Sequence, residues 1–123
     1  MLVDDGAEGR TAAFKRLESS LRALAMSPSD QLMLFPEDVV TADELARRFE
    51  RAWAAVRASY EDELSHTQTT ALVGVEGELE AMSRDSAEFD LELWTESALR
   101  TSEPWASVRR LALDALAALG ADG

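Results

Sequence analysis

Hydrophobic residues recur at every third or fourth position in three long parts of the chain, which is the spacing that lines one face of an α-helix. Residues 11–26 carry the first stripe, which consists of Phe14, Leu17, Leu21 and Leu24. The second stripe follows Thr41 and consists of Leu45, Phe49, Trp53, Val56, Tyr60 and Leu64. The third follows Ser102 and consists of Trp105, Val108, Leu111, Ala112, Ala115, Leu116 and Leu119. These stripes predict three amphipathic helices that bury their apolar faces in one core.

Residues that start and stop helices stand between these stripes. Ser27 before Pro28 predicts a short helix, because serine caps a helix and proline suits its first position. Thr41 and Glu44 have the spacing of a capping box, and the helix behind them is expected to reach Leu64. The remaining borders are Thr95 for a short helix through Arg100, Ser102 for the start of the last helix and Gly120 for its end.

The segment 67–83 fits two structures. Its apolar residues alternate as in a strand, but Leu72, Val75, Leu79 and Met82 also form a helical seam. Gly74 and Gly77 oppose a helix by about 1 kcal/mol each. A strand would have to pair with residues 85–94, which would set carboxylates opposite one another and weaken the ladder. The pattern therefore favours an all-α small helical bundle with about four main helices, with α+β and a hairpin at 69–95 as the alternative.

The chain of 123 residues is expected to form a single helical domain over residues 11–120, preceded by a flexible N-terminal tip at residues 1–10. The apolar connection 32–40 is expected to cover the core, with a partner-binding patch at Leu32–Phe35 as the alternative. The chain contains no cysteine, which excludes disulfides and thiol chemistry. Its acidic start lacks the features of a secretion signal, and no apolar run approaches the length of a membrane span, so a cytoplasmic protein is expected.

Negative charge is concentrated in one third of the chain. The stretch Glu61–Glu96 holds eleven carboxylates and a single basic residue, Arg84, so it carries −10 of the net charge of −12. Phosphate backbones and anionic lipids repel such a surface, which argues against direct binding of nucleic acid or membranes. Its natural partner is a basic protein. Two alternatives stay open: the charge only keeps the protein soluble, or basic residues of the flanking helices neutralise it from within.

The docking residues expected on this basis are six carboxylates and one aromatic residue: Glu76, Glu78, Glu80, Glu88, Asp90, Glu92 and Trp94. Trp94 ends the acidic run just before a helix cap, and an aromatic side chain beside charge is typical of an interface anchor. Trp53 and Trp105 lie on apolar helical stripes and are expected in the core.

Few side chains suit catalysis. The chain has one histidine, one lysine and one tyrosine, and it has no glycine-rich phosphate loop. Glu63 and His66 are three positions apart, so on one helix they would share a face and bind one metal. Carboxylate-bridged metal bundles need two such pairs, and only a symmetric dimer would supply the second. No cofactor and no metal are therefore expected, with Glu63 and His66 as the metal alternative.

The run Leu93–Leu119, the stretch Gln31–Val40 and the helix that starts at Thr41 resemble a pattern found in small, acidic, helical bacterial proteins of unassigned function. The resemblance covers most of residues 14–120. It implies no activity or site, and it favours a helix over residues 67–83.

Together these features predict a non-enzymatic acidic protein that docks on a basic partner protein and neutralises it. An immunity protein or antitoxin for a nuclease-type toxin is the concrete form. The alternatives are a structural helical homo-oligomer, with the stripe from Phe14 to Leu24 and the apolar last helix at a homodimer core, and the metal-binding bundle.

Overall fold

The computed structural model describes residues 4–36, 40–83 and 91–120. Over these residues every regular element is helical, which confirms the all-α prediction. The elements are α1 (Asp4–Ala25), α2 (Pro28–Leu32), α3 (Thr41–Tyr60), η1 (Glu61–Glu63), α4 (His66–Ala81), η2 (Leu91–Trp94), α5 (Glu96–Thr101) and α6 (Glu103–Leu119), where η marks a 3₁₀ helix. The helix α4 excludes the strand alternative for residues 69–81.

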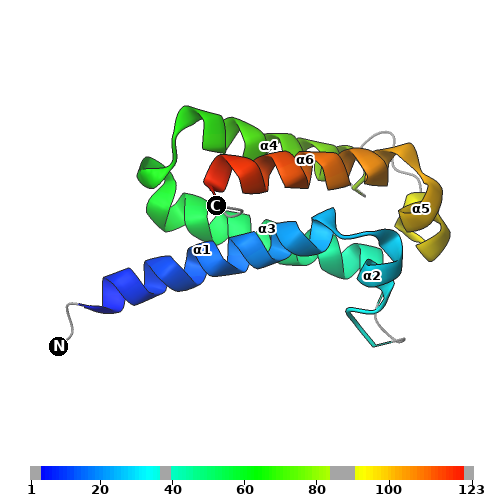
Figure 1. Ribbon diagram of the computed structural model, residues 1–123, viewed down its shortest axis with the longest axis horizontal. Coiled ribbons are helices and arrows are strands. Elements are labelled where there is room, and N and C mark those ends of the chain that lie inside the picture. Colours follow the sequence, from blue (N-terminus) through cyan, green and yellow to red (C-terminus); the bar gives the residue numbers. More distant parts are fainter. Residues whose placement is uncertain (1–3, 37–39, 84–90, 121–123) are drawn as a thin grey trace.

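The four long helices run alternately up and down and form two layers, with α1 and α3 in one layer and α4 and α6 in the other (Figure 1). The short helices α2 and α5 lie together at one end of the bundle. Helix α1 packs against α3 and α6, and α4 packs against α6. The contact between α3 and α4 is much smaller. This unequal packing leaves room for polar side chains between α3 and α4.

The three predicted apolar stripes meet in a common core. Leu17, Phe49 and Val108 are completely buried, and Trp53 and Trp105 are each 1% exposed, as expected for both tryptophans. The helical seam of α4 also points inward, because Leu72, Val75, Leu79 and Met82 are at most 2% exposed. The connection after α2 covers the core only in part, since Leu32 and Phe35 pack on it while Met33 is 84% exposed.

Most predicted helix borders are present. Ser27, Thr95 and Ser102 each accept a hydrogen bond from a backbone amide in the first turn of α2, α5 and α6, respectively. Gly120 ends α6 in the left-handed conformation, with φ of 74°, which glycine adopts at little cost.

Two helix borders differ clearly from the prediction. Helix α1 begins at Asp4 rather than Thr11, so it includes most of the segment assigned to a flexible tip. Helix α3 ends at Tyr60 rather than Leu64, where the acids of Glu61–Glu63 would oppose the dipole, and the chain tightens into η1.

The predicted capping box at Thr41 does not form. Val40 is the N-cap residue of α3, and Glu44 accepts a hydrogen bond of 2.9 Å from Nε of Arg48 instead of reaching back to the backbone. The capping box lies at the start of α4, where Ser65 and Gln68 each accept a hydrogen bond from the other's backbone amide. Ser65 and Gln68 carry the same sequence signal, so local pattern alone did not distinguish the two sites.

Candidate functional site

The carboxylates predicted to dock a partner do not share one surface. Glu76 and Glu80 are one turn apart on α4 and lie on the side that faces α3, where Glu76 binds Arg57. Glu78 lies on the other flank of α4, one turn after Gly74, which faces Leu111 of α6. Glu92 is exposed in η2. Glu88 and Asp90 lie outside the described residues.

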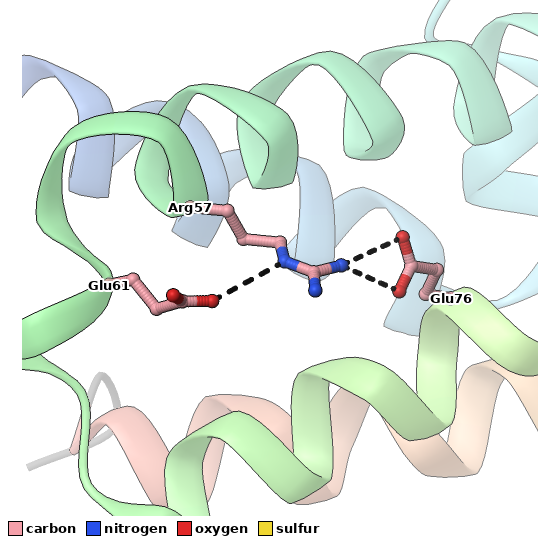
Figure 2. Close-up of polar contacts among 3 residues, drawn as sticks. All are labelled: Arg57, Glu61 and Glu76. Atoms are coloured by element: carbon pink, nitrogen blue, oxygen red, sulfur yellow. Dashed lines mark hydrogen bonds and ion pairs between the residues drawn. The ribbon is translucent and has the colours of Figure 1, made fainter.

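Arg57 connects the end of α3 to η1 and α4 (Figure 2). Its Nη1 lies 3.2 Å from Oε1 and 3.5 Å from Oε2 of Glu76, and its Nε lies 3.7 Å from Oε2 of Glu61. The guanidinium also stacks over the ring of Trp53, 5.2 Å from the ring centroid. One cation therefore serves two carboxylates from different elements.

Glu50 of α3 is part of this surface and was missed from the sequence. Partial burial of its carboxyl group raises its pKa, and the nearby carboxylates of Glu80 and Glu76 raise it further. Arg47 acts in the opposite direction and does not cancel them. Glu50, Glu76 and Glu80 are hereafter the α3–α4 carboxylate cluster. Helical spacing places Glu50 and Arg57 on one side of α3, but only the fold shows that α4 faces that side.

Basic residues neutralise the acidic stretch only in part. Arg10 forms an ion pair with Glu63, and Arg57 serves Glu61 and Glu76. Among the described residues, Glu80 has no ion pair. Two further arginines, Arg47 and Arg48, pair with Glu44, which lies outside the stretch, and the hydrogen bond from Arg48 holds the pKa of Glu44 below its ordinary value. Internal pairing therefore does not account for the whole stretch.

Trp94 is half-buried and is used for packing within the chain. Its indole Nε1 donates a hydrogen bond of 2.8 Å to the carbonyl oxygen of Met82. Its ring meets Trp105 edge to face, with 5.6 Å between ring centroids. The Nε1 of Trp105 in turn donates to the carbonyl oxygen of Leu93 at 2.6 Å. This pair of indoles joins η2 to the end of α4 and to α6.

The helical face predicted for Glu63 and His66 does not exist, and that prediction is wrong. Glu63 ends η1 and His66 begins α4, with the extended residue Leu64 and the cap Ser65 between them. The carboxylate of Glu63 is engaged by Arg10. Within the part of the chain that the structure describes, no three histidine or carboxylate side chains converge as a metal site would require.

Comparison with known proteins adds no relationship: no family model, no curated protein and no solved structure matches this chain. None of the helices in residues 4–36, 40–83 and 91–120 combines the length and apolar character that a membrane span requires.

Proposed function

We propose that this protein is a non-enzymatic binding protein that docks on a basic protein through the α3–α4 carboxylate cluster. The observation that carries the proposal is the gathering of three carboxylates from α3 and α4 on one surface, where burial, and then the charges of Glu80 and Glu76, raise the pKa of Glu50. Ionised carboxylates crowded in this way repel one another in the free protein. Lysine or arginine side chains of a partner would relieve that repulsion. This relief would make the free energy of binding more favourable.

The setting of the cluster suits this role. The three carboxylates project from two long helices of a packed bundle, so their spacing is held before a partner arrives. The net charge of −12 attracts a basic protein over long distances and speeds the encounter. Glu61 and Asp62 of η1 extend negative charge beyond the cluster.

The concrete form of the proposal is an immunity protein or antitoxin for a nuclease-type toxin. A nuclease needs a basic surface to hold the phosphates of its substrate. A rigid array of carboxylates competes for the same lysine and arginine side chains. In this form the protein acts in the cytoplasm and blocks a nucleic-acid site without binding nucleic acid itself.

The homo-oligomer alternative relied on the apolar stripe of α1 and on the apolar last helix. Of that stripe, Leu17, Leu21 and Leu24 are at most 1% exposed inside the single chain. These three side chains are therefore used for the core of the single chain, which leaves the last helix as the motive for a homo-oligomer.

A pair of charge-matched variants tests the proposal. The basic protein recovered with the wild type from its native source is purified, and its affinity is measured for three forms of this chain. The first form is the wild type, the second carries Glu50→Gln with Glu80→Gln, and the third carries Glu103→Gln with Asp114→Asn on α6. We expect the cluster variant to bind about tenfold more weakly or worse, since it loses two charge-assisted contacts.

The control variant has the same net charge and should retain most of the affinity. Removing Glu50 relieves repulsion in the free protein, so the cluster variant should remain folded by circular dichroism. Equal losses in the two variants would show that only net charge matters, and unchanged affinity in both would remove the proposal.

A further inference from the structure

A groove of about 860 Å³ runs between α1 and α3, and its lining differs from the rest of this acidic molecule. Its floor is made of small side chains, among them Ala13, Ser20 and Ala52, which are 6%, 5% and 7% exposed. One end is closed by the apolar side chains of Leu34 and Phe35, which follow α2. The groove therefore has an apolar base and an apolar end.

Cationic side chains form both walls of this groove. Lys15 and Arg16 come from α1, and Arg48 and Arg51 come from α3. Among the residues that the structure describes, Lys15, Arg16 and Arg51 form no ion pair. This is unusual on a chain with twice as many acidic as basic residues. Three cations are thus available at one place.

The groove contains a carboxylate of its own, but that group is already engaged. Glu44 accepts a hydrogen bond from Arg48 and lies 3.8 Å from Nη1 of Arg47. Arg48 also stacks over the ring of Phe35, 4.7 Å from its centroid, which holds the guanidinium at the apolar end. Of the charges that lower the pKa of Glu44, that of Arg51 has the smallest effect, so an anion in the groove would meet Arg16 and Arg51 with little competition from Glu44.

We propose that this groove binds a small amphipathic carboxylate, with its head between Arg16 and Arg51 and its apolar body along the floor toward Phe35. The volume lies within the range of small-molecule sites. The net charge of −12 disfavours a large polyanion, whereas one carboxylate meets mainly the nearby cations. The walls are flanks of two helices whose backbone amides are bonded internally, so they offer arginine forks rather than the amide cradle typical of phosphate sites.

This inference is independent of the α3–α4 carboxylate cluster, because the two sites involve different residues of α3. Decanoate, kept below its micelle concentration, is the probe, and binding is followed by isothermal titration calorimetry. We expect one decanoate per chain. The variant Arg16→Gln with Arg51→Gln should bind at least about tenfold more weakly, because two charge-assisted contacts are lost.

The matched control carries Arg100→Gln with Arg110→Gln, two exposed arginines of α5 and α6 that give the same net charge. It should bind decanoate within about twofold of the wild type. A third variant, Ala55→Glu, adds a carboxylate at an exposed position of the lining and should abolish binding, whereas Ala55→Gln should not.

Three results would overturn the proposal. The first is no decanoate binding, or equal binding by the wild type and the Arg16/Arg51 variant. The second is equally tight binding of decyltrimethylammonium, which has the same tail and the opposite charge. The third is equally tight binding of acetate, which would indicate an anion contact without a groove for an apolar body.

Discussion

At the scale of single residues, Gln31 is the buried polar side chain with the clearest structural task. It is completely buried, and its Nε2 donates hydrogen bonds of 3.0 Å to the carbonyl oxygens of Ala23 and Leu24. These carbonyls lie in the last turn of α1, where the helix itself supplies no donors. Gln31 thereby caps α1 from α2. Nothing in the local sequence signals this role, because it depends on the chain folding back after Ala25.

Replacing Gln31 with leucine should lower the free energy of unfolding by about 1–3 kcal/mol. The carbonyl of Leu24 loses the amide donor, and that of Ala23 keeps only the 3.4 Å hydrogen bond from the backbone amide of Met26. Urea denaturation followed by circular dichroism measures the change. The control is Met33→Leu two residues later, where the side chain is 84% exposed and the expected change is within about 0.5 kcal/mol. A Gln31→Leu variant as stable as the wild type would show that water replaces the amide.

Glu44 and Glu50 lie on the same helix, and their pKa values move in opposite directions. The hydrogen bond from Arg48 is the main cause that lowers the pKa of Glu44, whereas burial is the main cause that raises that of Glu50. A lowered pKa stabilises the fold above the ordinary glutamate pKa, and this contribution disappears as the pH falls through the lowered value. A raised pKa has the reverse effect: the fold loses stability as the pH rises from the ordinary value through the raised one.

The substitution Glu50→Gln should therefore raise the free energy of unfolding at pH 7, by about 0.5 kcal/mol or less because the side chain is only partly buried and water screens its charge. The gain should vanish as the pH falls below the ordinary glutamate pKa, where Glu50 is protonated in both states. Glu44→Gln should instead lower the stability at pH 7, and its effect should fade in acid. Urea denaturation midpoints of both variants at several pH values measure these changes. Stability changes of the same sign for the two variants at pH 7 would contradict the opposite pKa shifts.

At the scale of elements, α4 shows how tertiary contacts resolve an ambiguous local pattern. The glycines of α4 oppose a helix, but its seam of Leu72, Val75 and Leu79 is buried completely or nearly so, which gives the helix a core to pack on. The glycines are also not equivalent. A Cβ on Gly74 would lie 3.7 Å from Cδ2 of Leu111, whereas one on Gly77 would meet no atom within 4 Å.

Gly77→Ala should therefore stabilise the protein by about 0.5–1 kcal/mol, because alanine favours the helix and finds open space. Thermal denaturation should show a higher midpoint. Gly120→Ala provides the contrast, since a φ of 74° strains any residue with a Cβ and the midpoint should fall. A lower midpoint for Gly77→Ala would mean that the exposed side of α4 is covered in solution.

At the scale of the whole molecule, acidic and basic side chains gather on different surfaces. Helix α3 contributes Glu50 to the α3–α4 carboxylate cluster and Arg51 to the groove shared with α1. These residues are neighbours in sequence, but successive positions on a helix diverge by about 100°, so they serve different surfaces. A net charge of −12 summed over the chain hides this division.

Salt should raise the stability of this protein. The uncompensated negative charge repels itself in the folded state, and mobile ions screen that repulsion. We expect the urea midpoint to increase between about 10 mM and 500 mM sodium chloride, over which the screening length falls severalfold. The variant Glu50→Gln with Glu80→Gln should show a smaller increase. A midpoint that falls with salt would indicate that ion pairs such as Arg57–Glu76 outweigh the repulsion.

The sequence by itself determined three of the four long helices, their buried stripes and most helix borders, and it favoured a helix over a strand for α4 without excluding the strand. These features depend on neighbours within a few positions, where residue spacing and capping chemistry act directly. It determined neither the capping role of Gln31 nor the approach of Glu50 to Glu76 and Glu80. It also could not bring Arg16 and Arg51 to one groove, or Trp94 onto Trp105.

Each of those contacts joins elements far apart in the chain, so it depends on which helical flanks pack together. Local periodicity shows which face of a helix is buried but not which helix covers each side of that face. The α3–α4 carboxylate cluster and the basic groove lie on those sides, and only the tertiary structure assembles them.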